Sequence, residues 1–386
     1  MLTTPSIYMD HNATTPLDPR VFEAMRPYFM EMFGNAASRG HSYGWDAEAA
    51  VDRARQQTAA LLNARPDAIV WTSGATESNN LAIKGVADAH AHRGRHIITQ
   101  VTEHKAILDP CKRLQKHGYE ITFLGVDRFG RIDLEELRES IRPDTILTSI
   151  MWANNEIGTL QEIRQIGQIC REKGVLFHTD ATQALSKVPI DVDADCIDLL
   201  SMSGHKMYGP KGCGCLFVRN KPHRIELTPV LDGGGHERGY RSGTLNVTGI
   251  VGVGAACEIA QREMADEIPR LRGLRDRLQE GIMRHVDGVQ VNGYEPSRLP
   301  HMTNLAFDGV DHDQLLGALY GIAVSSGSAC TSASLEPSYV LSALGLPERL
   351  AFTSLRFALG KRNTADEVDI VIDRLGQAIG KLRGSR

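Results

Sequence analysis

One stretch of the chain surrounds a lysine with small residues and hydroxyls. It runs from Ser201 to Gly212, and in it Lys206 follows a glycine and a histidine and precedes a Gly/Pro turn. A lysine held at the end of a strand and partly desolvated can have a lowered pKa and form a Schiff base with an aldehyde. An isolated lysine is usually a surface charge, but this frame of hydroxyls, glycine and proline favours a functional residue.

Two further segments could bind an anion. Residues 73–80, with the sequence SGATESNN, lie between a predicted strand and a predicted helix. Free N–H groups at the start of a helix favour a phosphate, and the Thr76 hydroxyl can add a bond; an ordinary capped helix start is an equally good interpretation. Residues 233–244 combine glycines, two arginines and hydroxyls, which suit a phosphate or an acidic ligand. A mobile surface loop is the alternative interpretation of that segment.

A carboxylate ends another predicted strand, in the stretch from His178 to Gln183. Taken alone, Asp180 could be a metal ligand or a partner for a heterocycle nitrogen, but a helix cap is the commoner role. Asp180 followed by Lys206 is the arrangement that a pyridoxal phosphate enzyme needs. In such an enzyme the aspartate keeps the pyridine nitrogen protonated, while the lysine carries the cofactor and moves protons.

The elements that must position these residues indicate an α/β fold. Short runs rich in branched residues predict strands at 69–72, 96–100, 120–126, 145–152, 175–179, 196–202 and 213–218. Helical patterns precede or separate them, at 47–62, 77–91, 106–117 and 161–173. This alternation predicts a mainly parallel sheet that is covered on both faces. Ligands of such sheets bind at the ends of the strands, where the segments described above lie.

The pattern changes after about residue 260. A charged helix at 258–285 leads to shorter elements at 289–292, 302–307 and 314–320, and then to a final helix at 365–382. We therefore expect a large domain at 16–260 and a smaller domain formed by 1–15 and 261–386.

Length, charge and cysteine content narrow the class of protein. The 386 residues suggest two or three domains, and 42% hydrophobic with 23% charged residues exclude a disordered or fibrous chain. A net charge of −4 gives no reason to expect nucleic-acid binding. The longest uncharged run is apolar over about half of the roughly 20 residues that a membrane helix needs, and residues 1–15 lack a secretory signal. Seven scattered cysteines indicate reduced thiols in a cytoplasm.

The ordered set of motifs resembles the class V aminotransferase family of fold-type I pyridoxal phosphate enzymes, and more narrowly its group I cysteine desulfurases of the NifS/IscS type. The resemblance runs from the DHNATTP stretch at 10–16 to Leu355-Arg356-Phe357. It includes Thr102-Glu103-His104, Asn154-Asn155-Glu156, the Lys206 segment and the RGYRSGT stretch at 238–244. It implies a large domain with a mainly parallel seven-stranded sheet and a smaller α+β C-terminal domain.

The resemblance also implies how the cofactor, pyridoxal 5'-phosphate, is held. Lys206 bonds to it covalently, Asp180 pairs with its pyridine nitrogen, and Gln183 bonds the ring hydroxyl. His104 stacks on the ring and serves in proton transfer. The phosphate is held by Ala75, Thr76, Ser203 and His205, and by Thr244 of a neighbouring subunit, which implies a homodimer.

Two residues are expected to hold the substrate. Asn155, which also belongs to the cofactor site, and Arg356 bind the substrate carboxylate, a task for which the planar fork of arginine is suited. The substrate that the resemblance implies is L-cysteine.

The resemblance assigns the nucleophile to Cys330, in the Ser-rich stretch at 325–334. By composition alone, a thiol amid small polar residues is exposed, mobile and unremarkable, and no adjacent basic residue explains a lowered pKa. In the family, this thiol takes sulfur from L-cysteine and becomes a persulfide, and L-alanine is released. The sulfur then passes to an acceptor protein, for iron–sulfur cluster assembly or tRNA thiolation.

Two features of the sequence differ from what the family's properties alone would predict. Longer relatives have an extra C-terminal segment that helps to dock the iron–sulfur scaffold, and the sequence ends at Arg386 without it. Cys213 and Cys215 share one face of a strand, make a poor zinc site and are expected to be buried thiols. We expect no intrinsic metal site, and Cys330 could be a metal ligand only when it bridges a cluster with a scaffold.

The sequence leaves alternatives to a cysteine desulfurase open. One is a selenocysteine lyase or another lyase or aminotransferase of the same fold. Another is a non-catalytic or metal-holding subunit, against which the intact Lys206, Asp180 and Cys330 argue. Neither a membrane nor direct nucleic-acid binding is expected.

Overall fold

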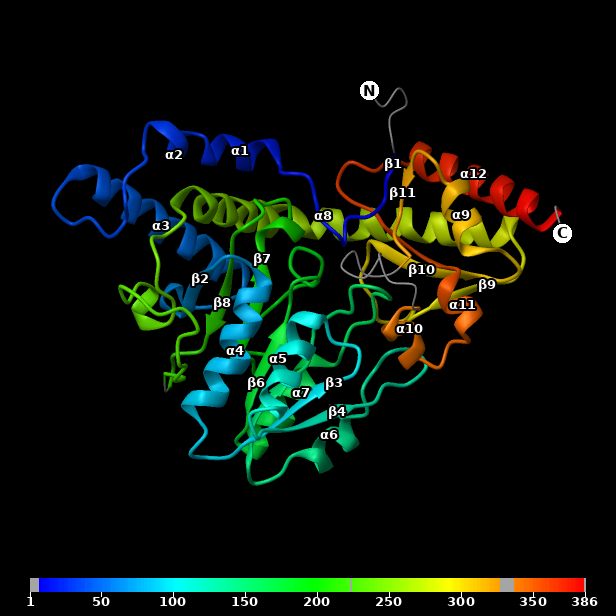
Figure 1. The fold of residues 1–386 in the computed structure, drawn as a ribbon. Helices are drawn as coiled ribbons and strands as arrows, with labels where there is room; N and C mark the ends of the chain where they lie inside the picture. Colours follow the sequence, from blue (N-terminus) through cyan, green and yellow to red (C-terminus); the bar gives the residue numbers. More distant parts are fainter. Residues whose placement is uncertain (1–6, 223, 327–336, 385–386) are drawn as a thin grey trace.

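The computed structural model describes residues 7–222, 224–326 and 337–384. Its largest sheet has seven strands in the order β2-β8-β7-β6-β5-β3-β4 (Figure 1). They are β2 (Ile69–Thr72), β3 (His96–Gln100), β4 (Glu120–Leu124), β5 (Thr145–Ser149), β6 (Leu176–Asp180), β7 (Leu199–Ser203) and β8 (Gly214–Val218). From β7 to β4 the neighbours are parallel, and β8 is antiparallel to both β7 and β2. Each predicted strand overlaps one of these, and the mainly parallel sheet is confirmed.

Helices cover both faces of this sheet. One face carries α4 (Ala75–Ala89) and α5 (Lys105–Gln115), and the other carries α3 (Ser42–Leu61), α7 (Ile163–Lys173) and the first half of α8 (Val247–His285). In α7, Ile163, Ile166 and Cys170 recur at helical spacing and are all buried, which explains why this segment forms a helix packed on one side. Gly174 ends it with a φ of +69°, a left-handed conformation that glycine adopts at little cost.

A second core surrounds a three-stranded antiparallel sheet of order β12-β10-β9. Its strands are β9 (Val289–Asn292), β10 (Met302–Phe307) and β12 (Ser354–Ala358), and it packs against the end of α8, α9 (His312–Ala318) and α12 (Ala365–Gly384). The short strand β1 (Ile7–Tyr8) pairs in parallel with β11 (Ile322–Ala323) in the same core. The remaining helices are α1 (Pro19–Met25), α2 (Pro27–Met30), α6 (Leu134–Ser140), α10 (Tyr339–Ala343) and α11 (Glu348–Phe352).

The 39-residue helix α8 runs between the two cores (Figure 1). It begins at Val247, earlier than the predicted 258. The prediction missed the first turns because they contain small residues, which let α8 approach other helices closely. A Cβ on Gly252 would lie 2.5 Å from Met25 Sδ, and one on Gly254 would lie 2.6 Å from Ala54 Cα. The predicted domain boundary at 260 falls inside α8, and the division into 16–260 and 1–15 with 261–386 stays a prediction. Neither α8 nor any other helix in the described ranges has the length and apolarity to cross a bilayer.

Candidate active site

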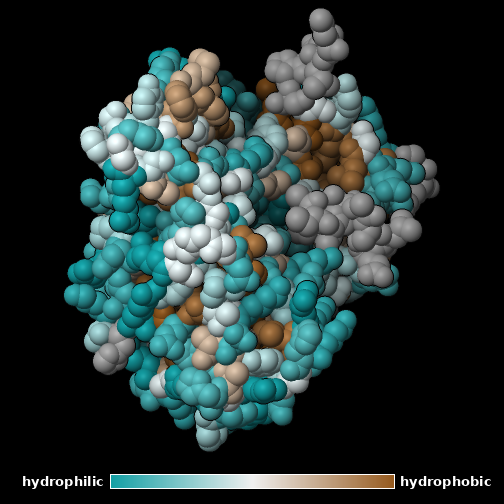
Figure 2. Space-filling model, turned by 60° about the vertical axis from the view of Figure 1, so that its left-hand side comes forward, coloured by the Kyte–Doolittle hydropathy of each residue, from teal (hydrophilic) through white to brown (hydrophobic). Residues whose placement is uncertain are grey.

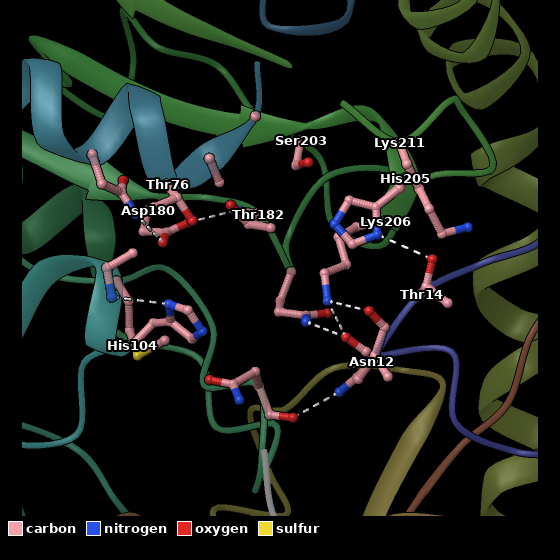
Figure 3. A pocket seen from close by; sticks show the side chains of 18 of the residues that line it. Asn12, Thr14, Thr76, His104, Asp180, Thr182, Ser203, His205, Lys206 and Lys211 are labelled. Carbon is pink, nitrogen blue, oxygen red and sulfur yellow. Dashed lines mark hydrogen bonds between the residues drawn. The ribbon is translucent and has the colours of Figure 1, made fainter. Parts of the chain in front are cut away.

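The ends of the parallel strands open into a cavity of about 490 Å³. The structure brings together around it most of the residues predicted from the sequence: Ala75, Thr76, His104, Asn155, Asp180, Gln183, Ser203, His205, Lys206 and Arg356. Figure 3 shows many of them, with Asp180 and His104 on one side of the view and Lys206 and Asn12 on the other. Thr244 is exposed and is not among the lining residues. Cys330 lies outside the described residues.

Asp180, the last residue of β6, is held by two donors. Its Oδ2 accepts from Asn79 Nδ2 at 2.7 Å, and its Oδ1 accepts from the backbone N–H of Thr182 at 3.0 Å. Near it, burial lowers the pKa of His178 to about 4 and raises the pKa of Glu103 well above its usual range. His178 is therefore neutral at pH 7, and the raised pKa of Glu103 favours its uncharged form. This environment suits the carboxylate of Asp180 for pairing with a cationic ring nitrogen.

The N-terminus of α4 points at the cavity without a side-chain cap. Its N-cap residue, Gly74, has φ +145° and ψ −177°, a conformation open essentially to glycine alone. A Cβ there would lie 3.4 Å from Ser203 Oγ, so the glycine keeps the space in front of that hydroxyl open. Uncapped N–H groups beside hydroxyls form an anion site.

His205 borders the same region as a neutral ring. Its Nδ1 lies 3.1 Å from Thr14 Oγ1, and burial, with the charges of Lys206, Lys211 and Lys187, lowers its pKa to about 4. It can therefore offer a hydrogen bond to a phosphate without adding a charge.

Lys206 follows β7 in a short 3₁₀ turn, Gly204–Lys206. Its Nζ donates to the backbone carbonyls of Asn12 and, at 2.8 Å, of Ala13 (Figure 3). Gln183 Nε2 donates to the same Asn12 carbonyl at 3.0 Å, whereas Gln183 Oε1 is a buried acceptor without a partner among the described residues. Such an orphan acceptor at a cavity wall suits a ligand hydroxyl.

These groups fit pyridoxal phosphate. The uncapped start of α4 suits its phosphate, Asp180 its pyridine nitrogen, Gln183 Oε1 its ring hydroxyl, and the amine of Lys206 its aldehyde.

His104 is the N-cap of α5 and borders the cavity. Its Nδ1 accepts the N–H of Ala106 at 3.1 Å, and burial lowers its pKa. The ring is therefore neutral at pH 7, and its proton resides on Nε2.

Arg356 reaches the cavity from β12 and is 1% exposed. Its guanidinium donates to Asp10 Oδ1 at 2.6 Å and to the backbone carbonyl of Asn155 at 2.9 Å, and its Nε–H is buried without a partner among the described residues. The group is thus fixed in orientation, and one of its donors has no partner among the described residues. Such an arginine at a cavity wall suits a carboxylate ligand.

Sequence analysis assigned no role to Asn12 or Asn79, although both lie in the quoted motifs. The side chain of Asn12 donates to the Asn155 carbonyl at 3.0 Å, and its Oδ1 lies 2.7 Å from His301 Nε2. The motifs identified the right segments, but no spacing rule connects residue 12 with residue 206.

Cys213, which directly precedes β8, and Cys215 on β8 are buried free thiols, as expected. Burial raises the pKa of Cys213 to about 12, so it is a protonated, unreactive thiol. Within the described ranges, no three His, Cys, Asp or Glu side chains are placed together to hold a metal ion.

Comparison with known proteins agrees with this geometry. The family described as Aminotransferase class-V matches residues 7–371. A cysteine desulfurase IscS from Anaeromyxobacter sp. (strain K) is 54% identical over 377 residues, which cover 98% of this chain and 93% of the relative. A solved NifS-like protein superposes with a TM-score of 0.90 at 36% identity, over 98% of this chain and 100% of the other. A structure of SspA in complex with cysteine has a TM-score of 0.81 at 38% identity, over 92% and 99% of the two chains.

The match to solved structures confirms the predicted fold class, and the family depends on pyridoxal phosphate. The chain belongs to the class V aminotransferase family and, within it, to the cysteine desulfurases of the NifS/IscS type.

Proposed function

We propose that this chain is a cysteine desulfurase that takes sulfur from L-cysteine, holds it as a persulfide on Cys330 and releases L-alanine. The observation that carries the proposal is the cavity itself, where the amine of Lys206, the carboxylate of Asp180 and the uncapped start of α4 converge. High identity with a cysteine desulfurase over nearly the whole chain supports the choice of substrate.

The residues that would hold pyridoxal phosphate act at separate parts of it. The N–H groups of Ala75 and Thr76 and the side chains of Ser203 and His205 take the phosphate, and Asp180 takes the pyridine nitrogen. When bound, the cofactor supplies an electron sink that allows the Cα–H bond of an amino acid to break.

The protein supplies the proton carriers and the substrate clamp. Lys206 Nζ removes the proton from the substrate Cα, and His104 exchanges a proton through Nε2, since its Nδ1 is occupied by the N–H of Ala106. Arg356 and Asn155 hold the substrate carboxylate, with the guanidinium kept in place by Asp10.

Sulfur transfer needs a second nucleophile. The Sγ of Cys330 attacks the substrate sulfur, so that an S–S bond forms as the C–S bond breaks. The electron pair of that bond stays with the carbon fragment, which is protonated and leaves as L-alanine. The persulfide then passes its terminal sulfur to an acceptor protein of iron–sulfur cluster assembly or tRNA thiolation.

We further propose that the enzyme works as a homodimer in the cytoplasm. Thr244 is exposed and does not line the cavity of its own chain, which supports a role at the phosphate of a neighbouring subunit. Its segment is held near the start of α4 by Arg241, whose Nε donates to Glu77 Oε1 at 2.8 Å. The cysteines in the described part of the chain are buried free thiols, which supports a reducing compartment.

The test is turnover of L-cysteine by the purified protein. With pyridoxal phosphate and a reductant, it should release alanine and sulfide in equal amounts, and mass spectrometry without reductant should find one extra sulfur on the Cys330 peptide. Cys330→Ala should keep the absorbance of the bound cofactor and lose the persulfide. A protein that stays colourless with added cofactor contradicts the proposal, and a Cys330→Ala variant active on selenocysteine alone would favour a selenocysteine lyase.

A further inference from the structure

Lys187 is buried directly behind Lys206. It is 7% exposed, and its Nζ donates to the backbone carbonyl of Lys206 at 2.9 Å and to that of Leu185 at 3.4 Å. Neither hydrogen-bond partner is a carboxylate. The Lys187 ammonium therefore lies out of water, held by neutral acceptors.

The charge of Lys206 adds to this cost. Lys206 and His205 face it from the turn after β7, His11 from the N-terminal segment and His301 from the start of β10. Burial, and then the charge of Lys206, lower the pKa of Lys187 to about 7. A methionine of similar length would fill the same space without burying an unpaired charge, so stability alone does not explain a lysine here.

The bond to the Lys206 carbonyl has a direct consequence for the chemistry. That carbonyl belongs to the main chain from which the Lys206 side chain extends, and the amine at the far end rests on the carbonyls of Asn12 and Ala13. Fixing the main chain fixes the arc over which the amine can move between these carbonyls and the cavity.

We propose that Lys187 is a positioning residue for Lys206, which holds the main chain of Lys206 in place. The inference rests on the proposed function, because it takes Lys206 as the lysine that joins the cofactor.

The effect of Lys187 depends on pH. Below about pH 7 Lys187 is charged, so it bonds the Lys206 carbonyl more strongly. Above that pH Lys187 becomes neutral, and its hydrogen bond to the Lys206 carbonyl becomes weaker.

The test compares K187M, which removes the amine, with K187R, which keeps a charge at every pH. K84M is the matched control, because Lys84 is a half-buried lysine on α4 whose pKa burial also lowers, and it does not line the cavity. Each cofactor-free protein is mixed with pyridoxal phosphate from pH 6 to 9, and the growth of the bound-cofactor absorbance is timed. Borohydride reduction and peptide mass then locate the adduct.

K187M should form the Lys206 adduct about tenfold more slowly than the parent at pH 6.5, equivalent to about 1.4 kcal/mol, and approach the parent rate at pH 8.5. K187R should form the adduct at the parent rate at pH 6.5. It should not show the change in rate that the parent shows near pH 7, where Lys187 loses its proton. K84M should match the parent at every pH. In urea, cofactor-free K187M should be at least as stable as the parent.

Equal rates for K187M and the parent across the pH range would overturn the inference. A K187M chain that unfolds more easily, or does not fold, would overturn it as well, because Lys187 would then be a structural residue. If the parent itself forms no adduct at Lys206, the proposed function falls together with the inference, and that failure is recognised because it occurs in the parent.

Discussion

Glu103 is a carboxyl group buried beside His104. Its Oε1 accepts the N–H of Met151 at 2.6 Å. Burial, with the charge of Asp180, raises its pKa well above the usual range. The raised pKa favours the uncharged form of Glu103, which avoids a second negative charge near Asp180, the group that would pair with the cofactor ring.

Glu103→Gln should therefore stabilise the cofactor-free protein at neutral pH. The folded state keeps the Glu103 proton to a higher pH than the unfolded chain, whose glutamate titrates near 4.3. The stability from this group is complete below about pH 4 and is lost as pH rises toward the folded pKa. Glutamine keeps the acceptor for Met151 and does not ionise, so it avoids that loss.

Urea unfolding at pH 4 and pH 8 measures the effect. The variant should gain more free energy of unfolding, relative to the parent, at pH 8 than at pH 4. An equal difference at the two pH values would show that Glu103 is not held neutral by the fold.

Among the elements, the start of α4 depends on a conformation that only glycine adopts easily. Gly74→Ala should cost about 1–3 kcal/mol, because φ +145° with ψ −177° is strained for any residue with a Cβ. The displaced backbone should also weaken binding of pyridoxal phosphate, measured by equilibrium dialysis. Gly273→Ala is the control, since its Cβ would meet nothing within 4 Å, and that change inside α8 should stabilise by about 0.5–1 kcal/mol. Equal cofactor affinity in the two variants would contradict this function for α4.

The segment at 233–244 is fixed to α3 and β2 by a buried ion pair. Both nitrogens of the Arg55 fork donate to Glu237 at 2.9 Å, and Glu237 Oε2 also accepts the N–H of Trp71 at 2.8 Å. The side chains are only 10% and 2% exposed. This ion pair fixes Glu237 beside β2, and it therefore fixes the place from which the segment continues toward Thr244.

Glu237→Ala should cost about 3–5 kcal/mol in urea unfolding, because it leaves the Arg55 charge buried and unpaired. Arg55→Met combined with Glu237→Met should cost less than Glu237→Ala, since no lone charge remains. A double variant that is less stable than Glu237→Ala would show that the pair contributes more than mutual neutralisation.

The elements around the site could be predicted because each has a local signal. Strands β2, β7 and β8 are buried throughout, so they are short continuous runs of mostly apolar residues bounded by polar ones. The early turns of α8 gave a weaker signal, because Gly252 and Gly254 serve helix packing and lower helix propensity.

At the scale of the whole molecule, the site combines groups from both cores, and this could not be predicted from local patterns. Segment 10–13 leaves the core that contains β1, places Asp10 against Arg356 and presents the Asn12 carbonyl to Lys206. Arg356 and Lys206, which the resemblance assigned to one site, both line the cavity, but the contacts with Asn12 and Lys187 depend on how the chain crosses the sheet. The hydrophobic periodicity of the sequence carries no information about such a crossing.

The N-terminal helices leave large apolar side chains on the surface, which supports the proposed homodimer. Phe29, Met30 and Phe33 are 59%, 75% and 65% exposed, and the Phe33 ring lies 5.3 Å from that of Tyr43. Figure 2 shows apolar atoms at the upper edge of the molecule, at the height where Figure 1 places α2. An exposed apolar group of this kind is typical of a surface that is covered in the assembled protein.

Phe29→Glu combined with Phe33→Glu should therefore shift the protein from dimer to monomer in sedimentation velocity, because two charges would be buried at the contact. The monomer should also bind pyridoxal phosphate less tightly than the parent, since Thr244 could no longer reach the phosphate of a neighbour. Tyr320→Glu is the control, as Tyr320 is 79% exposed at the end of α9, and it should leave both measurements unchanged. If the double variant remains a dimer with full cofactor affinity, the contact between subunits lies elsewhere on the molecule, and the apolar group on α2 needs another explanation.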